Sequence, residues 1–258
     1  MRLYFKYFAM QLKSILEYKK TFIISCIGQL VTSVFAFISI FFLFDKFGNI
    51  EGYTFNDVII CFSISFLGFS LAECFFRGFD QFDDMLGNGQ FDRILVRPRN
   101  LILQVLGTKI EFSKFGRALA AFAVFIILLI KRTELLQANK LFTVFLMILG
   151  TIIIYAGLFI LRAGISFFTI QSLEIMNIFT DGSRDLAQYP LNIYQKWVKK
   201  FFTFILPLAL VNYYPLLYLI DKSDNKLYAI LPILSALFTI PCYIVWKIGL
   251  RKYKSTGS

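Results

Sequence analysis

The residue types that carry most hydrolytic and metal chemistry are scarce in this sequence. There is no histidine among the 258 residues, which excludes Ser-His-Asp and Cys-His nucleophilic sites, His-ligated zinc and the HExxH motif. The four cysteines all lie inside apolar stretches and form no CxxC pair: Cys26, Cys61, Cys74 and Cys242. We interpret them as core or lipid-facing residues rather than as disulfides or metal ligands.

One cluster of carboxylates could hold a divalent ion. Asp80, Asp83 and Asp84 lie close together in the chain, and a helix would place Asp80 and Asp84 on one face. A membrane enzyme that modifies lipids, such as an acyl or phosphoryl transferase, needs such a cluster near one membrane surface. An integral-membrane lipid-modifying enzyme is therefore one function that this cluster would fit, and we keep it as an alternative.

Two other carboxylates lie within apolar segments. Glu73 and Arg77 are one helical turn apart, a spacing that favours a local ion pair. Glu174 has Gln171 and Asn177 three residues away on either side, so a helix would carry the three as one polar stripe. A carboxylate at membrane depth costs about 3 kcal/mol on insertion scales, so Glu174 is predicted to meet a partner or a wet pathway.

The composition places these residues in a membrane protein. Hydrophobic residues make up 58% of the chain and charged residues 17%, with 32 phenylalanines. A soluble chain of this length cannot bury so much apolar surface, so the surplus must face lipid. The net charge of +11 is then explained by basic residues gathered on the cytoplasmic side, with no need for a nucleic-acid partner.

The hydropathy pattern predicts an all-α fold with six transmembrane helices. Basic residues number five before Thr21, one in the loop 45–56 and seven from Arg77 to Arg117, which favours cytoplasmic N- and C-termini in the cell membrane and hence an even number of crossings. The predicted elements are an interfacial helix at 1–20, spans at 21–44, 58–76, 115–130, 141–161 and 227–246, and two short amphipathic helices within 79–98.

The position of the fifth crossing is open from composition. Residues 165–180 are apolar but contain the polar stripe, whereas residues 201–220 are more apolar but are interrupted by Pro207 and Pro215. A crossing at 201–220 keeps four basic residues inside and fits the charge rule better. A crossing at 165–180 turns 201–220 into a broken re-entrant hairpin that protein or water must cover.

Two long motifs resemble a known family. The sequence FDRILVRPRN (91–100) with the following LILQVLGTKIEFSKFGR, and YPLNIYQKWVKKFFTFILPLALVNYYPLLYLI (189–220), are similar to the membrane subunits of type-2 ABC exporters. The branch is the one in which two related permeases are often paired with one ATPase. The resemblance covers nearly the whole chain.

The resemblance implies a half-transporter of six spans that dimerises, with a sister permease favoured over an identical copy, and that sits on two cytoplasmic nucleotide-binding subunits. It implies a cytoplasmic coupling helix between spans two and three, at 79–98, and a re-entrant outer hairpin at 189–220. It therefore implies the fifth span at 165–182. No GxxxxGK[ST] motif occurs in the chain, so ATP and Mg²⁺ are expected on the partner ATPase.

The resemblance also suggests roles for individual residues. An amphipathic coupling element would dock its apolar face into a soluble motor, with two arginines at the rim and a proline that ends the helix. Two tyrosines of the hairpin and the polar stripe would line a path for a hydrophobic or amphipathic substrate. The expected coupling residues are Phe79, Phe82, Phe91, Ile94, Leu95, Arg93, Arg97 and Pro98, and the expected path residues are Gln171, Glu174, Asn177, Tyr213 and Tyr214.

Overall fold

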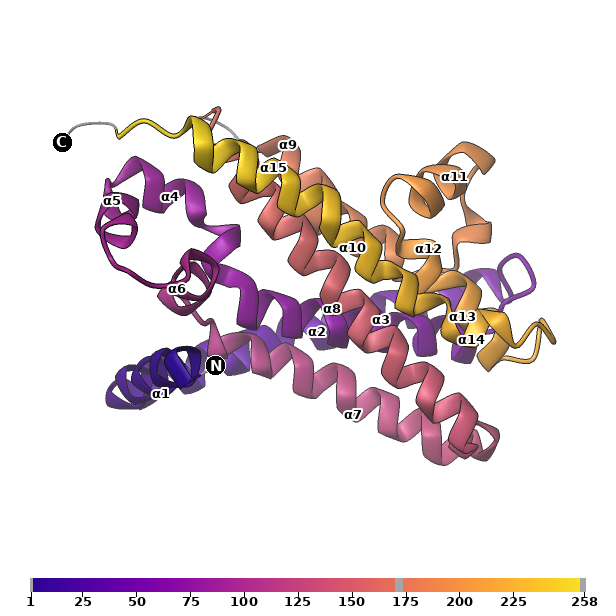
Figure 1. The fold of residues 1–258 in the computed structure, drawn as a ribbon. Helices are drawn as coiled ribbons and strands as arrows, with labels where there is room; N and C mark the ends of the chain where they lie inside the picture. The colour runs from indigo at the N-terminus through magenta and orange to yellow at the C-terminus, as the bar shows by residue number, and fades with distance from the viewer. Residues whose placement is uncertain (1, 170–173, 256–258) are drawn as a thin grey trace.

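The structure is a computed structural model that describes residues 2–169 and 174–255. In those two ranges the chain is helical, and its single β feature is an isolated bridge between Ile50 and Tyr53. The all-α prediction is confirmed. Figure 1 shows the long helices lying side by side as one bundle, with groups of short helices at its ends.

The described residues contain five helices that are long and apolar enough to cross a membrane. They are α2 (Lys19–Phe47), α3 (Phe55–Asp80), α7 (Phe115–Lys131), α8 (Ala138–Ser166) and the continuous stretch formed by α14 (Leu227–Ile230), the 3₁₀ helix Leu231–Phe238 and α15 (Thr239–Lys252). A sixth candidate is a pair of helices bent by 82°, Lys196–Phe204 and Leu208–Leu219. For the six predicted crossings, the described residues therefore offer five candidate helices, or six candidates if the bent pair counts as one span.

The remaining helices are short. They are α1 (Arg2–Glu17), α4 (Phe82–Gly87), α5 (Gln90–Leu95), α6 (Leu101–Thr108), α9 (Glu174–Asn177), α10 (Ser183–Ala187), α11 (Lys196–Phe204), α12 (Leu208–Val211) and α13 (Tyr213–Leu219). One end of the bundle carries α1, α4, α5 and α6 together with the C-terminal end of α15 (Figure 1). We call this end the α1 end.

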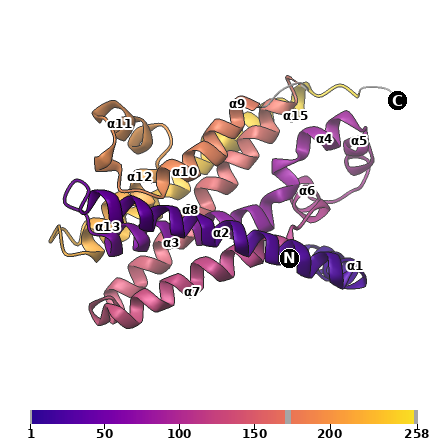
Figure 2. The ribbon, with the colours of Figure 1, turned by 180° about the vertical axis from the view of Figure 1, so that it is seen from behind.

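The helix α3 is the centre of the bundle and α2 is its edge. Within the apolar window of each helix, 89% of residues are buried for the α3 stretch and 17% for α2. Seen from behind, α2 lies at the front of the molecule (Figure 2). Because a soluble environment would not tolerate so much uncovered apolar surface, α2 presents its outer face to lipid or to another membrane chain.

A capping box fixes where α3 begins. The Asp57 backbone N–H donates to Thr54 Oγ1, and the Thr54 backbone N–H donates to Asp57 Oδ2 at 2.9 Å. This arrangement satisfies two of the free N–H groups at a helix start. Arg132, the residue after α7, pairs with Asp57 Oδ1 at 2.8 Å. This ion pair joins the end of α7 to the start of α3, at the end of the bundle opposite the α1 end.

The segment after α8 differs from the expected uninterrupted fifth span. Residues 170–173 lie outside the described residues, and 174–187 run through α9, a π-helical turn (Ile178–Gly182) and α10. Thr180 Oγ1 donates back to the Met176 carbonyl at 3.1 Å, a side-chain bond that competes with the backbone ladder. The 14 residues from Glu174 to Ala187 are not among the helices long enough to cross a membrane.

Candidate functional site

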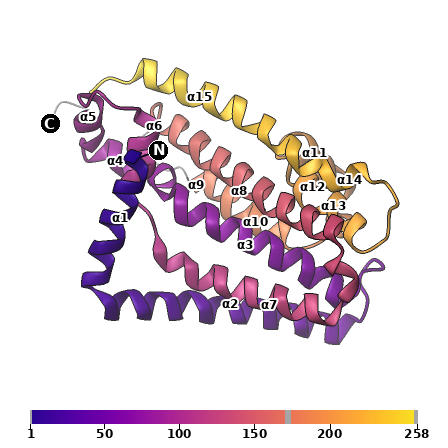
Figure 3. The same cartoon turned by 60° about the horizontal axis from the view of Figure 1, so that its bottom comes forward.

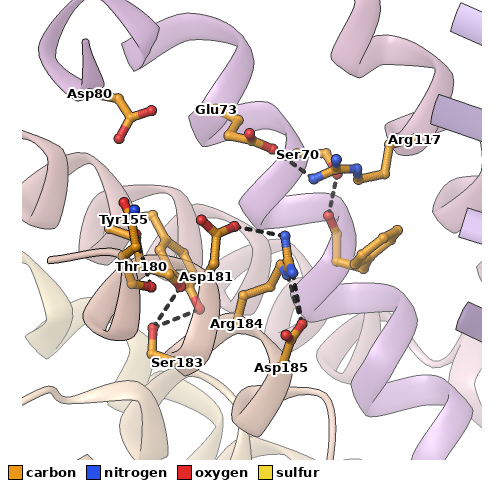
Figure 4. A network of polar contacts seen from close by, with 12 residues as sticks. Ser70, Glu73, Asp80, Arg117, Tyr155, Thr180, Asp181, Ser183, Arg184 and Asp185 are labelled. Carbon is orange, nitrogen blue, oxygen red and sulfur yellow. Dashed lines mark hydrogen bonds and ion pairs between the residues drawn. The ribbon is translucent and has the colours of Figure 1, made fainter. Parts of the chain in front are cut away.

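Glu73 is the centre of a buried charge network near the α1 end of α3. Its carboxylate lies 2.7 Å from Arg117 Nη1 on α7 and 2.8 Å from Lys114 Nζ (Figure 4). The predicted pair with Arg77 is confirmed, at a longer 3.6 Å. All four side chains are largely buried, and Arg77 also binds Glu111 at 2.8 Å. The network therefore ties α3 to the start of α7.

A second group of charges ties α3 to α8 and α9. Arg162 of α8 donates to Asp80 at 3.2 Å, to Asp83 at 3.3 Å and to the Asn177 side chain at 2.9 Å. Arg77 also binds Asp80. One guanidinium thus joins three separate elements, a role that its fork of five N–H donors makes possible.

These contacts bear on the expected metal chemistry of the aspartate cluster. Asp80 and Asp83 are neutralised by arginines, and Asp84 is exposed. The described residues include no group of three Asp, Glu, Cys or His side chains placed to hold a metal ion. The lipid-modifying alternative therefore has no support from this cluster.

A third group of charges lies on α10 and the turn before it. Arg184 lies between Asp181 and Asp185, 2.9 Å from a carboxylate oxygen of each, and its guanidinium is 5.1 Å from the centre of the Phe69 ring. Figure 4 shows this group facing α3 beside the Glu73–Arg117 pair. Phe69 lies about 20 Å along α3 from its first residue, so these charges are at the depth of the bundle's middle.

The two aspartates beside Arg184 are not buried by this chain. Their side chains are 56% and 61% exposed, for Asp181 and Asp185 respectively. Carboxylates at membrane depth avoid hydrocarbon and face protein, water or a partner. The exposed edge of α10 therefore marks a surface that is wet or covered by another polar chain.

The short helices between α3 and α7 have an apolar face that turns inward. The prediction had Phe79, Phe82, Phe91 and Ile94 docking an ATPase; in the structure they are buried within the chain itself. The Phe82 ring lies 4.8 Å from the Trp246 ring. This part of the predicted docking face is corrected. The amphipathic pattern showed that one face is covered, but Trp246 of α15 and Phe167 at the end of α8 cover it, rather than a partner.

The other predicted coupling residues are on the surface. Arg93, Arg97 and Pro98 are exposed, and Leu95 is 37% exposed. Val96, which the sequence did not single out, is 82% exposed. The outward edge of α5 and the residues that follow it thus combine cationic and apolar side chains.

The C-terminal tail fastens α5 to the end of α15. The Tyr253 hydroxyl donates to Asp92 Oδ1 at 3.0 Å, and the Ser255 hydroxyl donates to Asp92 Oδ2 at 2.7 Å. Burial, together with the hydrogen bond and charge of Asp92, raises the pKa of the Tyr253 phenol. The phenol therefore stays protonated and remains a donor at neutral pH.

A comparison with known protein families identifies the class of membrane protein to which these helices belong. Residues 30–257 match the family model described as ABC-2 family transporter protein. The chain belongs to the ABC-2 transporter family. Neither the curated proteins nor the solved structures give a match to it.

Membership makes this chain the multi-pass membrane permease of an ABC transporter, as the sequence motifs suggested. A permease of this family works with an ATPase subunit in a membrane. The chain is a transport component, and the lipid-modifying alternative has no support from the family either.

The expected substrate-path residues of this permease do not come together. Gln171 lies outside the described residues, Glu174 is exposed, and Asn177 binds Arg162 near the α1 end. Tyr213 is buried, and its ring lies 5.2 Å from that of Tyr214. In Figure 1 the helices α9 and α13 lie toward opposite ends of the bundle, so the stripe and the tyrosines are separate features.

Sequence reasoning missed most of the charge network of the permease. Arg117, Lys114 and Arg184 were not singled out, although each lies next to or inside an apolar stretch. The usable signal was Arg184 flanked by Asp181 and Asp185, a charge triplet within a segment already suspected of entering the membrane.

Proposed function

We propose that this permease is one half of an ATP-driven exporter that moves a hydrophobic or amphipathic substrate outward across the cell membrane. A second permease completes the path, a related sister chain being favoured by the sequence motifs, and two separate ATPase subunits bind ATP and Mg²⁺. The observation that carries the proposal is the pair of exposed aspartates beside Arg184, Asp181 and Asp185, because charges at that depth require a polar pathway.

The α1 end faces the cytosol in this proposal. It holds α1, the α4–α6 segment and the end of α15, which together carry most of the basic residues that the positive-inside rule assigns to the cytoplasm. Both termini are then cytoplasmic, because the broken segment 174–187 makes the sixth crossing. The bent pair of α11 with residues 208–219 becomes a re-entrant hairpin on the outer side, and an angle of 82° supports this over a straight crossing.

The outward edge of α5 is the docking surface for the ATPase. Arg93, Leu95 and Val96 are exposed there, while the opposite face of the segment packs on Trp246. A displacement of this edge by the motor is transmitted to α15 through aromatic contacts, and to α8 through the bonds of Arg162. The segment acts as a lever because its inner face is a packed core.

Co-purification tests this docking surface. The double variant L95S/V96S removes exposed apolar contacts without touching the core, and it is expected to lose most of the bound ATPase. The matched control is I240S/I244S, two exposed positions of the C-terminal span. If the L95S/V96S permease still binds the ATPase and the ATPase still turns over ATP, the docking role of this edge of α5 is refuted.

The substrate path follows the face shared by α2, α3 and α10. Arg117 reaches the Gln29 side chain of α2 at 2.7 Å, and Arg184 covers Phe69 of α3, so polar groups and aromatic rings alternate along this face. Such a surface suits a cargo with both apolar and polar parts. The second permease covers the uncovered side of α2 and closes the path.

Water accessibility tests the path. A cysteine at Asp185 in the assembled transporter is expected to react with a charged, water-soluble thiol reagent, whereas a cysteine at Ile244, an apolar position of the C-terminal span that is 52% exposed, is expected to stay unreacted. Equal reaction of the two positions, or none at position 185 in any nucleotide state, would contradict a polar path along α10.

A further inference from the structure

A recess between α1 and the residues after α5 gathers three positive charges. Its volume is about 400 Å³, and it is lined by Lys6, Tyr7, Met10, Arg97, Pro98 and Arg99. No carboxylate is among these residues. Within residues 2–169 and 174–255, the side chains of Lys6, Arg97 and Arg99 make no hydrogen bond or ion pair, in contrast to the buried arginines of the charge network.

Both walls of the recess are fixed by hydrogen bonds. The side chain of Gln11 on α1 donates to the Thr108 carbonyl of α6 at 2.6 Å. On the other wall, the Gln104 side chain donates to the Arg99 carbonyl at 3.1 Å, and the Arg97 backbone N–H donates to the Ile94 carbonyl at 3.2 Å. These bonds fix the backbone on both sides of the recess, and the three like charges that extend from it repel one another, so an anion between them is favourable.

The surroundings of the recess indicate where the anion comes from. Helix α1 lies across the end of the bundle, at a large angle to α2 (Figure 3), and it exposes Phe5, Met10 and Leu16. An amphipathic helix in this position lies in the membrane interface. A second recess of about 460 Å³ along α1 shares Lys6 and Met10 with the first and adds Lys13, Ser14 and Glu17, so the site borders both further charges and the exposed apolar side chains of α1.

We propose that Lys6, Arg97 and Arg99 form a binding site for the phosphate of an anionic glycerophospholipid. The phosphate lies between the three cations, Tyr7 borders it, and the acyl chains follow Met10 and Phe5 into the bilayer. This lipid clamps α1 to the end of the α5 segment. It is distinct from the transported substrate, because the recess lies at the α1 end of the bundle, whereas Arg184 of α10 lies beside Phe69 at the middle of α3.

Native mass spectrometry of the full chain in detergent tests the site. The wild-type chain is expected to bind phosphatidylglycerol at least tenfold more tightly than phosphatidylcholine. The variant K6Q/R97Q/R99Q is expected to lose this preference, at about fivefold in affinity per removed charge. The charge-conserving variant K6R/R97K/R99K is expected to retain it, which separates loss of the site from misfolding.

The matched control is K247Q/R251Q/K254Q, three exposed basic residues at the same end of the bundle. An equal loss in this control would overturn the proposal in favour of general attraction to basic surface. Binding of inorganic phosphate without any preference for phosphatidylglycerol would overturn the lipid as the source of the anion. Binding of the purified ATPase, and not of lipid, to Lys6, Arg97 and Arg99 would also overturn the proposal.

Discussion

Neutralising Glu73 tests whether the charge network holds the bundle together. The side chain of Glu73 is 8% exposed, and those of its partners Lys114 and Arg117 are 8% and 12% exposed. In the variant E73Q the shape is kept, but Lys114 retains Glu111 at the longer distance of 3.9 Å, and Arg117 retains the neutral partners Gln29 and the Phe66 ring. Removing one partner from a buried ion pair costs about 3–5 kcal/mol, because a buried charge is left uncompensated.

The quantity to measure is the free energy of unfolding. The detergent-solubilised chain is unfolded by increasing SDS, and the fluorescence of Trp246, which is buried in the folded chain, reports the transition. We expect E73Q to lower this free energy by about 3 kcal/mol. The matched control E134Q changes an exposed glutamate and should alter it by less than about 0.5 kcal/mol. In the double variant E73Q/R117Q the loss should be about 1–3 kcal/mol smaller than the sum of the two single losses. An E73Q chain as stable as E134Q would refute the reasoning.

Three further predictions concern the packing of the lever. G78A would place a methyl group 2.1 Å from the Val105 carbonyl oxygen and should cost about 2–3 kcal/mol in the same assay, whereas Gly87 faces open space and G87A should be nearly neutral. W246A should lower the thermal stability seen by circular dichroism by about 3–5 kcal/mol, while W197A, at a residue that is 67% exposed, should not. D92A, which removes both acceptor oxygens, should release the tail and speed trypsin cleavage there several-fold, unlike D84A. Because the Tyr253 phenol has a raised pKa, tail protection should be complete below about pH 10 and fall as the pH rises further.

The sequence predicted the long helices well because each one is an apolar run with its own start and stop signals. The 24 residues from Thr21 to Phe44 contain no charge, and that stretch lies within α2. The Glu73–Arg77 pair was also predictable, since it depends on helical spacing alone.

The partners of these residues across the bundle were not predictable from one sequence. Arg117 is 44 residues from Glu73, and Arg162 is 82 residues from Asp80. No periodicity links positions so far apart. For the same reason, the pattern around Phe82 and Phe91 showed that one face is buried but not that α15 buries it.

The break in the fifth segment was hidden for a different reason. The stretch from residue 165 to 182 is apolar and periodic enough to suggest one helix, yet its π-helical turn places Arg184 against Phe69. Backbone irregularity of this kind depends on tertiary contacts rather than on local propensity.

Labelling of a single cysteine at Val96 tests the central claim most directly, because it reports both the side of the membrane and the contact with the motor. In a chain with C26S, a membrane-impermeant maleimide should label V96C in inside-out vesicles only, and label N49C, in the loop at the opposite end of the bundle, in right-side-out vesicles only. Bound ATPase should protect V96C from the reagent. Labelling of V96C from the outer side, or unchanged labelling in the presence of the ATPase, would contradict the account.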